Sequence, residues 1–185
     1  MLTLSRDGRA SGFTLVELMT GVAIVSILAA VATPSFTSFL RNTEVRGSSE
    51  SILQGLQLAR TEAIRRNGRV CFDWSGVGTG WVVSTGCLAT PGGVPQVQVI
   101  QSQSNREGSV SSLVTTSPAG SVRVAFNGFG RVVPNIVGGT SITSIDIVAA
   151  STPLTRRIQV SAGDMSGRVF VCDPSATPST HFACN

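Results

Sequence analysis

The chain has 185 residues, of which only 13% are charged, and its formal net charge at pH 7 is +4. A charge this small does not by itself indicate nucleic acid or a membrane surface as a partner. Few charges and a mean hydropathy of +0.28 are unusual for a purely water-soluble protein, so an apolar segment is sought first.

That segment lies close to the N-terminus. From Phe13 to Thr33 the only ionisable side chain is Glu17. Twenty-one helical residues rise roughly 31 Å, which matches the hydrocarbon core of a bilayer. Arg6 and Arg9 precede the segment and favour a cytoplasmic N-terminus, with the rest of the chain across the membrane. The sequence therefore predicts a protein that spans a membrane once, with its C-terminal part on the side away from the cytoplasm.

Two simpler interpretations compete. A cleaved secretory signal would find small residues for its cleavage site at Ala29–Ala32, but the apolar run is long for a signal and contains a carboxylate. A plain membrane anchor fits the length and leaves Glu17 unexplained. A carboxylate within a span costs a few kcal/mol and usually marks a function and a partner.

A cut between Gly12 and Phe13 would supply such a partner. Phe13 would then carry a new α-amino group, four residues before Glu17 on the same helix face. The carboxylate would also oppose the positive end of the helix dipole. It could equally pair with the amine of a neighbouring copy and so set the stagger of stacked helices, because only the correct neighbour relieves the cost of burying it.

The stretch GFTLVEL, residues 12–18, resembles the class III signal of type IV pilins and of the pseudopilins of type II secretion. The resemblance implies cleavage after Gly12 and N-methylation of Phe13 by the prepilin peptidase. It also implies the assembly role of Glu17 described above, and it identifies Pro34 as the proline that kinks the helix near the end of its apolar half.

The helical pattern continues beyond Pro34. Asn67-Gly68 is a good C-terminal stop, with Arg65 and Arg66 in the last turn. Most charged residues fall off one stripe, which we expect to pack on the sheet that follows. The stripe consists of Val45, Ser49, Ile52, Leu56, Ala59 and Ala63, flanked by Leu53 and Ile64.

After Gly68 the hydrophobic period changes to 2, with turn residues between short runs, which predicts an antiparallel β domain. Asn127-Gly128 is a strong signal for a two-residue hairpin turn. The predicted strands are Arg69–Trp74, Gly80–Thr85, Val97–Gln103, Ser109–Thr115, Ser121–Phe126, Arg131–Val133, Thr143–Ala149, Arg156–Ser161 and Arg168–Cys172.

The predicted fold class is α+β and pilin-like, with a long N-terminal helix packed on the antiparallel β domain. We expect a leader peptide over 1–12, a transmembrane and assembly half of the helix over 13–34, an amphipathic half over 35–68 and a periplasmic β domain over 69–185. Residues 90–95 and 174–180 are loop-like in composition.

A second resemblance covers most of the chain. The run LQLARTEAIRRNGRVCF, residues 56–72, is similar to the GspH/FimT branch of minor pilins, where such a run ends the long helix and opens the first strand. Within the branch the C-terminal segments look closest to FimT and FimU of type IV pili. Further segments that fit the branch are Gly80–Val83, Phe126–Arg131, Arg157–Ser161 and Gly167–Val169.

The four cysteines, Cys71, Cys87, Cys172 and Cys184, all follow the apolar segment. An even count there suggests two disulfides in an oxidising periplasm. Three connectivities exist, and we favour Cys71–Cys87 with Cys172–Cys184. A zinc site is the rival interpretation, but the sequence has no Cys-x2-Cys pair and His181 is its single histidine, so we expect no metal.

The sequence does not favour catalysis, and we expect neither catalytic residues nor a cofactor. Gly76–Gly80 mimics a nucleotide-binding loop, but the residues after it are strand-like and the spacing is wrong, so a tight turn is expected. The single histidine, His181, lies in a segment rich in Pro and Ser, which disfavours a Ser-His or Cys-His arrangement.

Binding of double-stranded DNA is the sharper alternative. FimT-like members of the branch are associated with DNA uptake in natural transformation. In the family a Gly-Arg-x-Arg motif near the C-terminus is the part that would hold the phosphates of DNA. The matching positions here begin with Gly167 and Arg168, but Phe170 replaces the second arginine. Arg156 and Arg157 could add charge. Binding through these groups would be weak and salt-sensitive, and strand-edge solubilising arginines are the competing interpretation.

The resemblance therefore implies a minor pilin that is incorporated into, primes or caps a type IV pilus. Its partners would be other major and minor pilins, the prepilin peptidase and the inner membrane. A DNA-binding minor pilin for natural transformation is the alternative, and a minor pseudopilin of type II secretion is a third.

Overall fold

The computed structural model describes residues 12–76, 78–87, 98–104, 112–136, 138–149, 154–161, 167–177 and 183–184. Most of the expected leader, the loop over 90–95 and His181 lie outside the described residues. The chain divides into two compact units, Met1–Phe39 and Leu40–Asn185, and each is described by itself.

Helix α1 runs from Leu15 to Arg66, 52 residues in all. It ends where the sequence predicted, because Asn67 adopts a left-handed conformation with φ of 46°. The N–H of Gly68 then donates to the carbonyl oxygen of Ala63 at 3.1 Å, which is the bond of a Schellman C-cap.

In the described part of the chain, no single helical stretch is both long and apolar enough to cross a membrane. The segments Leu15–Val31 and Ser35–Arg66 satisfy that test together, by length and composition, as a bent pair. The bend contains Pro34, the residue at which the sequence predicts a kink.

The predicted stripe on the second half of α1 is confirmed. All six of its members are buried, at 3% exposure or less. Leu53 is partly buried beside them, whereas Ile64 is 49% exposed. The helical period therefore located correctly which face of α1 enters the core.

Within the described residues, nine strands form two antiparallel sheets. All nine occur where the sequence predicts them, with ends shifted by a few residues, but their division into two sheets was not predicted. In spatial order the first sheet is β3 (Val99–Gln103), β2 (Trp81–Thr85), β1 (Val70–Trp74), β5 (Arg123–Phe126) and β6 (Val132–Val133), and the second is β4 (Ser112–Ser117), β7 (Ser144–Ala149), β8 (Thr155–Val160) and β9 (Val169–Cys172).

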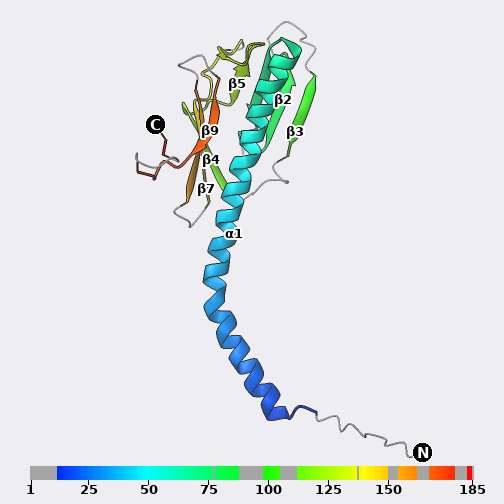
Figure 1. Cartoon of the computed structure of the whole chain (residues 1–185), viewed down its shortest axis with the longest axis vertical. Helices are drawn as coiled ribbons and strands as arrows, with labels where there is room; N and C mark the ends of the chain where they lie inside the picture. The colour runs from blue at the N-terminus through cyan, green and yellow to red at the C-terminus, as the bar shows by residue number, and fades with distance from the viewer. Residues whose placement is uncertain are drawn as a thin grey trace, which may run out of the picture. The chain divides into compact units, whose positions relative to one another are not determined.

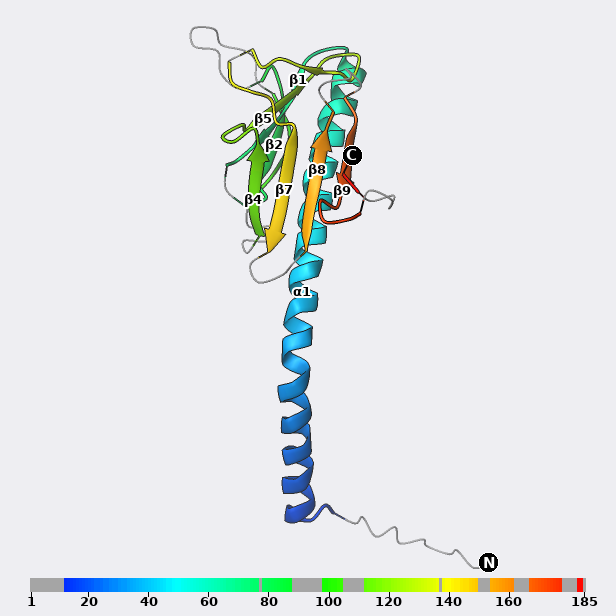
Figure 2. The ribbon, with the colours of Figure 1, turned by 90° about the vertical axis from the view of Figure 1, so that its left-hand side faces the viewer.

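Both sheets share one core with α1. Figure 1 shows β2 and β3 on one side of the second half of the helix and β7 and β9 on the other. Figure 2 shows the second sheet face-on, with β4, β7, β8 and β9 side by side. The core combines helix residues such as Leu56 with Phe72 of the first sheet and Ile145 and Ile158 of the second. The helix stripe is therefore covered by side chains from both sheets.

Gly55 marks a close approach of α1 to the first sheet. A Cβ atom there would lie 2.8 Å from the ring of Phe72 and 2.9 Å from that of Trp81. We expect Gly55→Ala to lower the free energy of unfolding by about 1–3 kcal/mol through overpacking, although alanine is the better helix former by about 1 kcal/mol.

Gly47→Ala is the matched control, because nothing lies within 4 Å of a Cβ at that helical position. It should stabilise the domain by up to about 1 kcal/mol. Urea unfolding of the fragment from Leu40 onward measures both variants. If both changes stabilise the fragment, the contact between helix and sheet at Gly55 is looser than described.

The structure contains two disulfides, Cys71–Cys87 and Cys172–Cys184, which are the pairs favoured from the sequence. Cys71 lies between Val70 and Phe72 on β1, so its side chain enters the face of the first sheet opposite the helix. Cys71 and Cys87 are buried there with Ala125. The second disulfide joins the end of β9 to the C-terminal residues.

The hairpin between β5 and β6 exists, but the predicted two-residue turn is wrong. Phe126 pairs with Val132, so residues 127–131 form the connection. Asn127 closes the loop by donating its N–H to the carbonyl oxygen of Arg131 at 3.0 Å. Gly130, with φ of 71°, supplies the left-handed residue. The side chain of Asn127 bonds within the loop, which favours this wider connection over a tight Asn-Gly turn.

Candidate functional site

The first half of α1 exposes nearly all of its apolar side chains. Phe13 is 83% exposed, and every described side chain as far as Phe39 is exposed. An apolar surface of this extent is unfavourable in water and marks contact with a membrane or with other proteins. The large exposed side chains are Phe13, Leu15, Val16, Leu18, Met19, Val22, Ile24, Val25, Ile27, Leu28, Val31, Phe36 and Phe39.

Glu17 lies in the first turn of this helix, and a cap that sequence reasoning missed places it there. The N–H of Glu17 donates to Oγ1 of Thr14 at 3.2 Å, so Thr14 is the N-cap and Glu17 the third helical residue. The sequence does contain a signal for this cap, because Thr14-x-x-Glu17 is the pattern of a capping box. The cap fixes where the helix begins and therefore how far Glu17 stands from Phe13.

The hydroxyl groups of the apolar segment are satisfied within the helix. Ser26 donates to the carbonyl oxygen of Val22 at 2.7 Å, and Thr33 to that of Ala29 at 2.7 Å. No described residue forms a hydrogen bond or ion pair with the carboxylate of Glu17. Glu17 is thus the one ionisable side chain of the described apolar segment, and the described residues leave it without a counter-charge.

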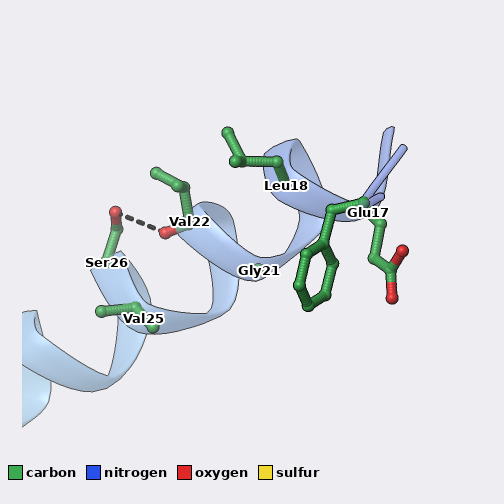
Figure 3. Close-up of a pocket in the computed structure, with 7 residues that line it drawn as sticks. Glu17, Leu18, Gly21, Val22, Val25 and Ser26 are labelled. Carbon is green, nitrogen blue, oxygen red and sulfur yellow. Dashed lines mark hydrogen bonds between the residues drawn. The ribbon is translucent and has the colours of Figure 1, made fainter. Parts of the chain in front are cut away.

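A shallow apolar groove lies beside Glu17 (Figure 3). Gly21 forms its floor, since nothing stands within 4 Å of a Cβ at that position. Phe13, Leu18, Val22 and Val25 contribute its walls. In Figure 3 the carboxylate of Glu17 points away from the helix axis at one end of the groove. A side chain of a neighbouring helix that enters this groove would come close to the carboxylate.

The Gly76–Gly80 segment is a turn, as predicted. Indole Nε1 of Trp74 donates to the carbonyl oxygen of Gly78 at 2.8 Å, and the N–H of Ser75 donates to the carbonyl oxygen of Gly80 at 3.0 Å. The turn joins β1 to β2, two antiparallel strands. No helix follows it, so it lacks the helix N-terminus that a phosphate-binding loop uses.

The candidate DNA-binding arginines do not form one free cluster. Nε and Nη2 of Arg157 donate to the two carboxylate oxygens of Asp146 on β7, at 2.6 and 2.8 Å. This bond raises the pKa of Arg157, and the pair neutralises its charge. Hydrogen bonds from Ser175 lower the pKa of Asp173, with a smaller contribution from the charge of Arg156. The charge on β8 is therefore partly compensated by carboxylates.

Gly167 and Arg168 lie beside the β5–β6 hairpin. Gly167 has φ of 60°, and a Cβ at its position would overlap the carbonyl oxygen of Gly130. The guanidinium carbon of Arg168 stands 5.8 Å from the ring centroid of Phe170, a cation–π geometry. The residue that replaces the motif's second arginine thus contacts the first.

Two family models match this sequence. Residues 8–33 match the prokaryotic N-terminal methylation motif, which covers the capped start of α1 and its apolar groove. Residues 48–164 match the model described as type II transport protein GspH. The chain belongs to the GspH family. The match spans the second half of α1 and strands β1 to β8, so it covers most of the shared core.

Relatives of this GspH-family chain include fimbrial proteins of Neisseria meningitidis serogroup B, 42% identical over 76 residues, and of Pseudomonas aeruginosa, 35% identical over 109 residues. These alignments cover 40% and 56% of this chain, and 41% and 66% of the relatives. A third relative is the type IV major fimbrial protein FimA of Dichelobacter nodosus, 36% identical over 83 residues, which are 44% of this chain and 49% of the relative.

The fold is that of a solved minor pilin. The crystal structure of the type IV minor pilin FimU of Pseudomonas aeruginosa superposes with a TM-score of 0.54 at 18% identity. The superposition covers 77% of this chain and 98% of the FimU chain. The α+β, pilin-like fold class predicted from the sequence is therefore confirmed.

Proposed function

We propose that this GspH-family chain is a minor pilin that is built into a type IV pilus and primes or caps it. The observation that supports this most is the first half of α1, an exposed apolar helix with one carboxylate at its capped start. A helix that exposes this much apolar surface is unfavourable in water. Membrane lipid before assembly and neighbouring helices after assembly would both cover it.

Processing would create the counter-charge for Glu17. Cleavage after Gly12 would leave an ammonium group on Phe13, which remains charged when N-methylated. Glu17 of one subunit would pair with the ammonium of the next, and the groove over Gly21 would receive an apolar side chain of that neighbour. Because an unpaired charge is costly in an apolar bundle, the pair would select one axial stagger.

The partners that follow are other major and minor pilins, the prepilin peptidase and the inner membrane. Residues 8–33 match the methylation motif, and the relatives are fimbrial proteins, which supports this set. The globular domain would lie in the periplasm before assembly, and its two disulfides suit that oxidising compartment.

The decisive experiment analyses filaments sheared from the native host. We expect the mature chain in these filaments, and we expect mass spectrometry to find N-methylated Phe13 at its start. An intact Gly12–Phe13 bond in filament-associated protein would contradict the processing step. Absence of the chain from filaments, with normal filament number in a deletion strain, would contradict the minor-pilin assignment.

A minor pseudopilin of type II secretion is the second candidate, which the description of the matched family favours. The two roles predict opposite phenotypes for a deletion strain. A pilus subunit would be needed for filaments and twitching motility. A pseudopilin would be needed for protein secretion, with motility and transformation intact.

DNA capture is the third candidate, and it receives less support because Arg157 is paired with Asp146. Its test measures binding of duplex DNA to the fragment from Leu40 onward at two salt concentrations. If Arg168 holds a phosphate, Arg168→Ala should weaken binding and reduce the salt slope by about 1. Binding that is absent at low salt, or indifferent to Arg168, would remove this candidate.

A further inference from the structure

Three segments that carry the resemblance to minor pilins meet at one place in the fold. They are the C-terminal end of α1, the loop 127–131 and Gly167–Arg168. A Cβ on Gly128 would lie 2.5 Å from Oδ1 of Asn67, and one on Gly130 would lie 2.8 Å from Cδ1 of Ile64. Gly167 packs against the carbonyl group of Gly130. We call this region the hairpin-loop surface.

The loop at its centre is held in one conformation. Oδ1 of Asn127 accepts hydrogen bonds from the N–H groups of Phe129 and Arg131, both at 3.0 Å. The N–H of Gly130 donates to the carbonyl oxygen of Asn127 at 2.8 Å, and Nε of Arg60 donates to the carbonyl oxygen of Gly130 at 3.2 Å. The backbone of the loop is therefore fixed both by its own bonds and by α1.

The effect of this arrangement is to present an aromatic side chain to solvent. Phe129 is 80% exposed, and Ile64, which contacts the same loop, is 49% exposed. Neither side chain belongs to the core. A large aromatic on a rigid loop loses little conformational entropy when it enters a pocket, which is the property of a binding hot spot.

Three arginines lie close to the loop that carries Phe129. Arg131 and Arg168 are exposed and are next in sequence to Gly130 and Gly167, and Arg60 reaches the loop from α1. Glu62, on the same helix as Arg60, accepts hydrogen bonds from Arg65 and Arg66, which lower its pKa to about 2. A partner that covers this surface would be complementary if its rim carried carboxylates.

We propose that Phe129 inserts into an apolar pocket with an acidic rim on the globular domain of a neighbouring pilin subunit. This inference rests on the proposed pilus function. A protein is favoured over single-stranded nucleic acid because Phe129 is one exposed aromatic side chain and not a row for successive bases. The charge from Arg69 onward is also small, with seven arginines against five carboxylates.

The test uses purified globular domains of the host's other pilin subunits and the fragment from Leu40 onward, which contains the whole core. Phe129→Ser should weaken binding to one of these domains at least about tenfold, and Arg131→Glu should weaken it further at low salt. Leu113→Ser, at another exposed apolar position, is the control and should bind as wild type does. Thermal unfolding should be the same for Phe129→Ser and wild type.

Absence of binding by the wild-type fragment to every pilin domain would overturn the proposal. The proposal would also be overturned if Phe129→Ser bound a pilin domain as tightly as wild type does, or if Leu113→Ser lost as much binding as Phe129→Ser. The same holds if Phe129→Ser weakened binding to DNA and left binding to the pilin domains unchanged. Full-length chains in the host separate this failure from that of the proposed function. Wild-type and Phe129→Ser chains that enter filaments equally would overturn only the docking role of Phe129. A wild-type chain absent from filaments would overturn both.

Discussion

Glu17→Leu should accumulate in the membrane at normal levels and be absent from assembled filaments. Leucine removes a carboxylate that costs a few kcal/mol in an apolar segment, so membrane insertion itself should become easier. The loss would arise at assembly, where the ammonium of the neighbouring Phe13 would lack its partner. Breaking a buried charge pair costs about 3–5 kcal/mol, which corresponds to a loss of incorporation of more than about 100-fold.

Glu17→Gln tests whether assembly depends on the negative charge of Glu17. Glutamine serves as well as glutamate at the third position of a capping box, so the cap with Thr14 should survive this change. Glutamine carries no negative charge, however, so we expect Glu17→Gln to be excluded from filaments as Glu17→Leu is. Immunoblots of sheared filaments and of membranes measure both variants. Normal incorporation of Glu17→Gln would show that assembly does not need the negative charge of Glu17, and normal incorporation of Glu17→Leu would contradict the whole assembly account.

The parts of the structure that were predictable are those set by local pattern. The stripe from Val45 to Ala63 follows from the helical period, and the stop at Asn67 from turn chemistry. The N-terminal motif could also be recognised, because Gly12, Phe13 and Glu17 are close in sequence and residues 8–33 match the methylation motif. The roles of these three residues stay predictions. The N-cap Thr14 was missed, although its spacing from Glu17 fits the pattern of a capping box.

The parts that were not predictable depend on contacts between distant residues. Alternation of apolar and polar residues identifies a strand but does not say which strands pair, so the division into two sheets could not be predicted. The pair of Arg157 with Asp146 is a cross-strand contact between β8 and β7, and it changes the interpretation of a candidate site. The hairpin-loop surface depends on Gly130 meeting Gly167, which are far apart in the chain.

Gly167→Ala should destabilise the globular domain by about 2–5 kcal/mol. Alanine costs roughly 1–2 kcal/mol in the left-handed conformation that Gly167 adopts, with φ of 60°. Its Cβ would also overlap the backbone carbonyl of Gly130, and the hairpin would have to shift, which adds about 1–3 kcal/mol. Urea unfolding of the fragment from Leu40 onward measures the change.

Gly120→Ala separates the two contributions, because Gly120 has φ of 79° and nothing lies within 4 Å of a Cβ there. It should cost only the roughly 1–2 kcal/mol of the left-handed conformation. Equal losses in the two variants would mean that Gly130 and Gly167 are not in close contact. A larger loss for Gly167→Ala would show that the glycine of the Gly-Arg motif is required for packing. Loss of DNA binding in a Gly167 variant would then be no evidence for a phosphate site, and only Arg168 variants that fold normally could test one.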